Sequence, residues 1–211
     1  DMTNWIQRIL VLLRSATGHD FSAYKQSTIF RRVERRMAVH QIERIEEYVQ
    51  YLRQNESELH SLFRELLIGV TGFFRDPQGF ESLMENAVKP IVASRAPGNP
   101  LRVWTPGCST GEEAYSIAIL FMEEMERSGR QFAVQIFATD IDQSAIDKAR
   151  QGLYPANIAM DVSPERLGRY FVQEGPDAFR VKKSVRDMVV FAEQNVIKDP
   201  PFSKIDLISC R

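Results

Sequence analysis

The chain has 211 residues, of which 44% are hydrophobic and 26% charged, with a formal net charge of -1. This composition is typical of a globular protein with one or two domains, and the near-neutral charge argues against general binding to nucleic acid or to anionic membranes. The two cysteines, Cys108 and Cys210, and three scattered histidines indicate neither a disulfide framework nor a metal site, so we expect no bound metal and a reducing, cytoplasmic setting. No apolar run approaches the ~20 residues of a membrane span and the N-terminus lacks a secretory signal, so we expect no direct membrane insertion.

The first third of the chain carries apolar residues at helical spacing. They predict four helices, over residues 3–17, 28–39, 43–55 and 57–68. Thr3, Thr28 and Ser57 are the expected N-caps, and Gly18 is the expected stop of the first helix. We therefore expect an all-helical domain over residues 1–69.

A connecting segment is expected over residues 70–99. Asp76 and Pro77 are typical of a helix start, and this helix should end before Pro90, because proline cannot donate within a helix. The run Ala96–Pro100, rich in proline and glycine, is typical of a linker. The next domain should begin at residue 100.

Four arginines lie opposite the apolar stripe of the predicted helix over residues 28–39: Arg31, Arg32, Arg35 and Arg36. Like charges four residues apart destabilise a helix, which makes the cluster informative. It is either a solvated face, partly neutralised by Glu34 and Glu43, or a docking surface for an acidic partner protein. Nucleic acid is a poor partner for it, since no aromatic residues are interleaved with the arginines.

The segment Leu101–Tyr115 predicts a strand, a glycine-rich turn and the start of a helix that stops at Gly129. A second, nearly all-apolar strand over Phe132–Thr139 ends in Asp140-Ile141-Asp142, and a short helix over Ser144–Arg150 follows. Strand, helix and apolar strand in this order indicate a βαβ unit of a doubly wound parallel sheet.

Residues 152–187 lose this α/β alternation, and we interpret them as an insertion. It should hold a helix from Ser163-Pro164 and short antiparallel strands over 179–181 and 185–190. Residues 188–191 are expected to return to the core sheet, and 205–209 to form a final buried strand. The fold class is thus α/β, with the α/β domain spanning 100–211.

The turn Gly107–Gly111 is compatible with several kinds of site. It matches G-x-S-x-G, but a serine hydrolase of that type needs a histidine after the serine, and every histidine here precedes it. A phosphate-binding loop needs a lysine after the second glycine, and Glu112 and Glu113 would repel phosphates. The spacing of a dinucleotide-binding turn is also absent.

A ligand with a positive charge, an amino-acid end and a ribose would suit both the glycines and the carboxylates. S-adenosylmethionine has all three. Glu112 or Glu113 could bind its α-ammonium, and Asp140 or Asp142 could accept hydrogen bonds from the ribose hydroxyls. The alternative for the two glutamates is that they are first-turn carboxylates favoured by the helix dipole.

Four blocks of the sequence resemble the CheR family, the chemotaxis-receptor protein-glutamate O-methyltransferases. These are VTGFFRDP at residues 70–77, GCSTGEEAYS at 107–116, ATDID at 138–142 and DLISCR at 206–211. Their order and spacing match the family from about residue 20 to the end. The stretch GHDFSAYKQSTIFRRVERRM most resembles members fused to a CheB-type methylesterase. The resemblance implies a Rossmann-like class I S-adenosylmethionine methyltransferase domain with an incomplete sheet and a small antiparallel insertion.

The resemblance also implies roles for individual residues. Thr71 and Arg75 would line the cofactor and methyl-transfer site, with Arg75 as the catalytic residue; the alternative for this arginine is an ion pair with Asp76 or with a neighbouring helix. The remaining cofactor-binding positions would be Gly107, Gly111, Glu113, Asp140, Asn195 and Val196. Arg31, Arg32, Arg35 and Arg36 would dock a helical chemoreceptor, and S-adenosylhomocysteine would be the product.

The chain departs from the family pattern in two places. Gly69 stands where members often carry asparagine, and the motif C-R-N-x-x-x-Y is cut at Arg211. We therefore expect an excised piece of a longer protein that is poorly active or inactive. The sheet edge after Ile205–Ser209 would invite pairing with another chain, giving a dimer. The competing interpretation is a regulatory module that binds cofactor or protein without turnover.

Overall fold

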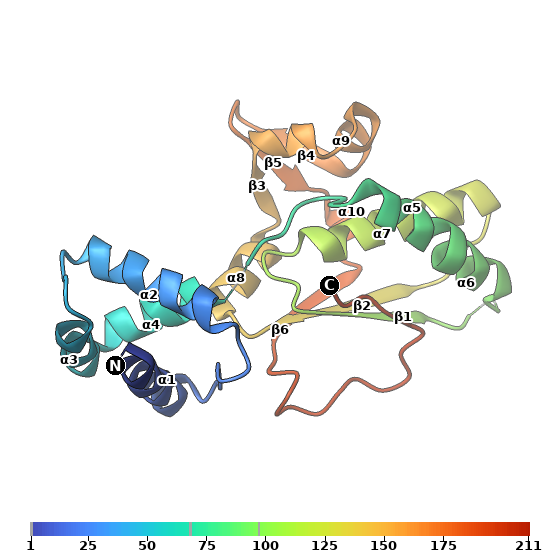
Figure 1. The fold of residues 1–211 in the computed structure, drawn as a ribbon. Coiled ribbons are helices and arrows are strands. Elements are labelled where there is room, and N and C mark those ends of the chain that lie inside the picture. The colour runs from blue at the N-terminus through green and yellow to red at the C-terminus, as the bar shows by residue number, and fades with distance from the viewer. Residues whose placement is uncertain (1, 68, 97) are drawn as a thin grey trace. The chain divides into compact units, whose positions relative to one another are not determined.

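The computed structural model describes residues 2–67, 69–96 and 98–211 (Figure 1). Two compact units divide the chain, Asp1–Ile68 and Gly69–Arg211, and each has its own cluster of buried apolar side chains. Ile68, the expected end of the fourth helix, and Pro97 of the expected linker lie outside the described residues. None of the described helices is long and apolar enough to cross a membrane.

The first unit is all-helical, as predicted. Its helices are α1 (Met2–Thr17), α2 (Gln26–Val39), α3 (Ile45–Gln54) and α4 (Glu56–Leu66). Gly18 ends α1 as expected, with φ 69° and an N–H that donates to the Arg14 carbonyl at 2.9 Å. The expected caps are wrong, because Thr3, Thr28 and Ser57 all lie inside their helices. Helices held by a buried apolar face do not need a side-chain cap at the predicted position.

The second unit contains a four-stranded parallel sheet in the order β6-β2-β1-β7. The strands are β1 (Leu101–Pro106), β2 (Val134–Asp140), β6 (Val189–Glu193) and β7 (Leu207–Ile208). Helix α7 (Glu112–Ser128) follows β1, and α8 (Gln143–Gln151) follows β2, which confirms the predicted βαβ unit. The predicted final strand is shorter than expected and not buried: Ile208 is 55% exposed, because β7 is the edge strand and pairs only with β1.

The helix that begins at Pro77 runs past Pro90, contrary to the prediction that it ends there. It consists of α5 (Pro77–Leu83), a π-helical turn (Met84–Val88) and α6 (Lys89–Ser94). A proline inside a regular helix lacks its N–H and clashes with the carbonyl four residues earlier. The wider π turn lies directly before Pro90 and takes up this misfit, so the helix continues.

The insertion forms a second, three-stranded antiparallel sheet in the order β3-β5-β4 (Figure 1). Its elements are β3 (Leu153–Pro155), a 3-10 helix (Ala156–Met160), α9 (Pro164–Tyr170), β4 (Phe171–Glu174), β5 (Ala178–Val181) and α10 (Lys183–Arg186). The predicted strand over 185–190 is half wrong: Val185 lies in α10, and only from Val189 does the chain enter the core sheet as β6. Val185 is fully buried, so its apolar character reflects packing, not a strand.

Candidate functional site

The loop Gly107–Gly111 joins β1 to α7 in a tight conformation. Gly107, Ser109 and Gly111 all have positive φ, at 69°, 47° and 94°. The Cys108 N–H donates to the Thr139 carbonyl at 2.9 Å, which ties the loop to β2. A methyl group on Gly111 would lie 2.9 Å from a carbon of Phe191, whereas a Cβ on Gly107 would meet nothing within 4 Å. The loop is therefore packed at its helix end and open at its strand end.

Asp140 ends β2 beside this loop, and its carboxylate accepts hydrogen bonds from two backbone N–H groups. Oδ2 accepts the Ser109 N–H at 2.7 Å, and Oδ1 accepts the Asp142 N–H at 2.9 Å. A carboxylate offers about four acceptor positions, so about two remain for a ligand. Asp142 is instead the N-cap of α8 and accepts from Ser144 and Ala145. Of the two aspartates considered for a ribose, Asp140 is the one that contacts the glycine loop.

Glu112 and Glu113 begin α7 but have different partners. The Glu112 carboxylate accepts the Thr110 hydroxyl, at 2.7 and 2.9 Å, and the hydroxyl of Thr71. Burial raises the pKa of Glu112, against the effect of these hydrogen bonds. Glu113 accepts a hydrogen bond from the Ser209 hydroxyl at 2.7 Å, which brings the end of β7 to the same place. Glu113 is thus the less committed of the two carboxylates.

The segment of residues 70–76 lies against α7 and is strained. Phe74 and Asp76 have φ of 46° and 65°, and the Phe74 N–H donates to Ser116 Oγ on α7 at 3.1 Å. Arg75 is exposed, and its Nη1 donates to the Val70 carbonyl at 2.6 Å. Within the described part of the chain Arg75 has no carboxylate partner, since Asp76 faces Arg211 instead. The alternative ion pair considered for Arg75 is therefore not formed.

Asn195 and Val196 follow β6 in a turn. The Asn195 side chain accepts the Ile197 N–H at 3.0 Å, and its own N–H donates to Asp199 at 2.7 Å. Val196 is 53% exposed, so it presents apolar surface at the carboxyl end of β6. Such a surface can pack against the face of a planar base.

The predicted cofactor residues thus share one edge of the sheet. Gly107 follows β1, Asp140 ends β2 and Asn195 follows β6, and in parallel strands these carboxyl ends lie side by side. The strand order reverses at β1, with β2 on one side and β7 on the other. Ligands of open α/β sheets bind outside the carboxyl ends at such a reversal.

Cys108 lies within the loop but is not suited to react. Burial, followed by the nearby Asp140 charge, raises the pKa of its thiol far above the usual range. The thiolate is the reactive form of cysteine, so a thiol held protonated is a poor nucleophile. Cys108 is best described as a small packing residue.

The four arginines of α2 divide into two kinds. Arg36 is 19% exposed, and its guanidinium donates two hydrogen bonds to the buried Glu58 carboxylate on α4, from Nε at 2.9 Å and from Nη2 at 2.5 Å. Arg32 and Arg35 both contact Glu65, and Arg35 remains 66% exposed, as Arg31 also remains exposed. The acidic partners are on α4, not the expected Glu34 and Glu43. Arg36 therefore holds the helical unit together, and Arg31 and Arg35 offer the accessible charge.

Glu58 is the centre of a polar cluster in the helical unit. Its carboxylate also accepts from the Tyr48 hydroxyl at 2.8 Å and contacts His40 Nε2 at 2.7 Å. Burial alone would raise the pKa of Glu58, but the hydrogen bonds from Arg36, Tyr48 and His40 outweigh it and lower the pKa. The cluster thus keeps a buried carboxylate ionised.

Two family models cover nearly the whole chain. The CheR methyltransferase all-alpha domain matches residues 4–67, and the CheR methyltransferase SAM binding domain matches residues 69–211. The chain belongs to the CheR methyltransferase family. The match covers both structural units, including the loop and the carboxylates described above, and it supports S-adenosylmethionine as the cofactor.

Named relatives agree with this assignment. The chain is 31% identical to a chemotaxis protein methyltransferase of Borreliella burgdorferi over 98% of its own length and 75% of the relative. It is 30% identical to that of Salmonella typhimurium over 97% of its length and 70% of the relative. An uncharacterized 104.1 kDa protein of Rhodobacter capsulatus is 43% identical over 97% of this chain, which spans only 21% of that protein.

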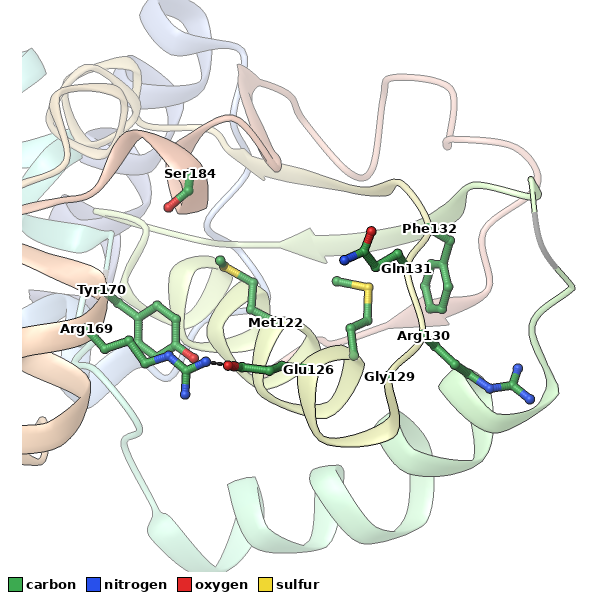
Figure 2. Close-up of a pocket in the computed structure, with 10 residues that line it drawn as sticks. Met122, Glu126, Gly129, Arg130, Gln131, Phe132, Arg169, Tyr170 and Ser184 are labelled. Carbon is green, nitrogen blue, oxygen red and sulfur yellow. Dashed lines mark ion pairs between the residues drawn. The ribbon is translucent and has the colours of Figure 1, made fainter.

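A second concave surface of this CheR-family domain lies at the other end of α7. It is a groove of about 700 Å³ whose lining includes Met122, Met125, Phe132 and Tyr170. Figure 2 shows Met122 of α7 near Tyr170 of α9, and Phe132 farther along the groove. Arg169 of α9 and Glu126 of α7 form an ion pair at its rim. Met122, the first residue of α7 in the groove, lies 11 residues after Gly111, which at about 1.5 Å per residue places the groove at least about 16 Å along the helix from Gly111. It is separate from the carboxyl-end site.

Sequence reasoning missed two residues that shape the site. Ser209 binds Glu113, and the Tyr154 hydroxyl of β3 donates to the Thr110 carbonyl in the loop at 2.7 Å. The position of Ser209 at the end of a predicted strand was the available signal. Nothing in the sequence pointed from Tyr154, 44 residues away, to the loop.

Proposed function

We propose that this chain binds S-adenosylmethionine across the carboxyl ends of β1, β2 and β6 and transfers its methyl group to glutamate side chains of a chemoreceptor. The products would be glutamate methyl esters and S-adenosylhomocysteine. The observation that carries the proposal is the pair of partly free carboxylates, Glu113 and Asp140, on either side of the glycine loop. The names of the relatives support the receptor as substrate, and a cytoplasmic location is part of the proposal.

The residues at this edge fit the chemical groups of the cofactor. Glu113 would bind the α-ammonium of the methionine end, and Asp140 would accept the ribose hydroxyls with the acceptor positions that its two amide partners leave free. Val196 offers apolar surface for the adenine, with Asn195 beside it. Gly107 leaves open space where a side chain would otherwise stand.

Methyl transfer to a carboxylate depends mainly on how the two reactants are positioned. When bound, S-adenosylmethionine supplies an electrophilic methyl group on a sulfonium sulfur. The attacking glutamate is already ionised near neutral pH, so no general base is needed. Opposite charges neutralise in the transition state, so fixed geometry and exclusion of water matter most. The Arg75 side chain, whose described hydrogen bond goes to a backbone carbonyl, is available to orient the substrate carboxylate, and Thr71 lies beside Glu112.

Docking of the receptor is proposed for the exposed arginines of α2. Arg31 and Arg35 offer positive charge at the surface, since Arg35 remains 66% exposed although it shares Glu65 with the less exposed Arg32. The Arg36 guanidinium is occupied by Glu58. An acidic helical surface of the receptor would complement the two exposed arginines. Arg36 contributes by keeping α2 in place on α4.

Calorimetric titration with S-adenosylhomocysteine tests the cofactor site. We expect the unmodified chain to bind it and Glu113→Gln to bind at least tenfold more weakly, because a charge-assisted contact to the ammonium is lost. Glu126→Gln is the matched control on the same helix, since its carboxylate faces the distant groove; its affinity should change less than twofold. A folded chain that releases no heat, or equal affinities for the two variants, would contradict the proposed site.

A further inference from the structure

The insertion contacts the segment that carries Thr71 and Arg75. Phe73, which is 1% exposed, packs edge-to-face between Tyr154 of β3 and Phe171 of β4, with ring centroids 4.8 and 5.2 Å away. Tyr154 also reaches the glycine loop through its hydrogen bond to Thr110. The insertion is therefore part of the wall behind the proposed site.

Phe74, the next residue, is held by the helix of the insertion. The Arg166 guanidinium of α9 lies 4.1 Å from the centroid of the Phe74 ring. Two hydrogen bonds fix that guanidinium to Glu123 of α7, Nε to Oε1 at 2.9 Å and Nη2 to Oε2 at 2.8 Å. A bidentate arginine is locked in direction as well as in place, so the ring beneath it has little freedom.

The backbone at Phe74 needs such support. Its φ of 46° is unusual for a bulky residue, and conformations of this kind persist only when their surroundings hold them. The Phe74 N–H is fixed by Ser116, and the ring by Arg166. Arg75 follows directly, so the direction in which its side chain leaves the backbone depends on Phe74.

We propose that Arg166 is a positioning residue for methyl transfer, which holds Phe74 and through it sets the orientation of Arg75 toward the substrate carboxylate. This proposal rests on the proposed function. The insertion then acts as a clamp on the methyl-transfer segment, and anything that moves α9 alters the position of Arg75 while leaving Glu113 and Asp140 as they are.

The chain provides a matched control for this role. Arg169 lies on the same helix, α9, and forms an ion pair with Glu126 of α7 (Figure 2). Arg166 pairs with Glu123 of α7 in the same way. The Arg169 guanidinium lies over Tyr170, 5.2 Å from its centroid, and not over Phe74. Arg169→Gln therefore removes an α9–α7 ion pair without touching the segment 70–76.

The test compares Arg166→Gln with Arg169→Gln in methyl transfer to a chemoreceptor cytoplasmic fragment. We expect Arg166→Gln to lower kcat about tenfold, with the Kd for S-adenosylhomocysteine changed less than twofold. Arg166→Lys, which keeps a cation over the ring but loses the bidentate contact, should recover part of the rate. Arg169→Gln should change neither quantity more than twofold. Equal kcat in the two glutamine variants, or a parallel loss of cofactor affinity and kcat in Arg166→Gln, would overturn the proposal.

Hydrogen exchange of a peptide covering residues 70–76 gives a readout independent of turnover. The exchange rate should rise in Arg166→Gln, fall back toward normal in Arg166→Lys and stay unchanged in Arg169→Gln. If the unmodified chain neither binds S-adenosylhomocysteine nor transfers methyl groups, the proposed function fails, while exchange still decides whether Arg166 holds the segment. If the unmodified chain is active and exchange is equal in all variants, only the role of Arg166 fails.

Discussion

Gly111 is the last residue of the proposed cofactor loop and the N-cap of α7, and its replacement by alanine tests how tightly the loop is packed. Its φ is 94°, and an added Cβ would lie 2.9 Å from Ala149 Cβ and from Phe191 Cζ. Ala149 is fully buried and Phe191 is 7% exposed, so neither can move freely. We expect Gly111→Ala to destabilise the second unit and to weaken cofactor binding.

The magnitude follows from two terms. An L-residue in the left-handed region costs roughly 1–2 kcal/mol, and forcing a methyl group into a packed core costs roughly 1–3 kcal/mol more. Gly129 supplies the matched control, because it ends the same helix with φ 67° and a Cβ there would meet nothing within 4 Å. Gly129→Ala should carry the first term alone. The two variants should therefore differ by about 1–3 kcal/mol in the free energy of unfolding.

Urea unfolding measures this difference. Of the two tryptophans, Trp5 lies in the first unit and Trp104 in β1 of the second, so fluorescence in a Trp5→Phe background follows the second unit. Trp104 is 7% exposed and donates to Thr139 at 3.0 Å, which makes its emission sensitive to unfolding. If Gly111→Ala and Gly129→Ala unfold with the same free energy, the close approach of α8 and β6 to the loop is refuted.

Two further predictions concern single carboxylates. Asp140→Asn should weaken binding of S-adenosylhomocysteine about 10- to 100-fold by calorimetry, since charged hydrogen bonds are worth roughly 1.5–3 kcal/mol, whereas Asp142→Asn should keep its cap on α8 and bind normally. Glu58→Gln should destabilise the helical unit by about 3 kcal/mol in denaturant, because it leaves Arg36 without its buried carboxylate partner. The pKa of Glu58 is lowered in the folded state. The stability that ionised Glu58 gives the helical unit is therefore complete above the ordinary pKa of glutamate and is lost as pH falls through the folded pKa. An acid titration by circular dichroism should show that loss in the unmodified chain and not in Glu58→Gln.

The parts of the fold that follow local patterns could be predicted. The βαβ unit, the glycine turn and the acidic end of β2 all result from periodicity and from turn residues within about 40 positions of sequence. The π-helical turn before Pro90 could not be predicted, because it is an adjustment of a packed helix and leaves no pattern of its own. Strand β4 was missed for a similar reason: Phe171–Glu174 is too short to show alternation.

The residue types of the site could be predicted from the sequence, but the side chains that each of them contacts could be predicted less well. Glu112 and Glu113 are neighbours in the same helical turn, so their residue types left both open. The family resemblance favoured Glu113, and the contacts of Glu112 with Thr71 and Thr110 distinguish the two in the structure. The charge of Arg36 was visible, but not Glu58, which is 22 positions away. Arg166 and Glu123 are 43 positions apart, and no local signal joins them. Long-range pairing of this kind depends on the tertiary fold.

Methyl transfer itself tests the central claim most directly. The chain is incubated with S-adenosylmethionine labelled in the methyl group and with a chemoreceptor cytoplasmic fragment. The labelled methanol that alkali releases from the fragment is then measured, because alkali hydrolyses carboxylate methyl esters. We expect label on the fragment that base releases, and little or none with Glu113→Gln. Binding of S-adenosylhomocysteine without any transfer to the fragment, or label that resists base, would contradict it and would favour a cofactor-binding module without turnover.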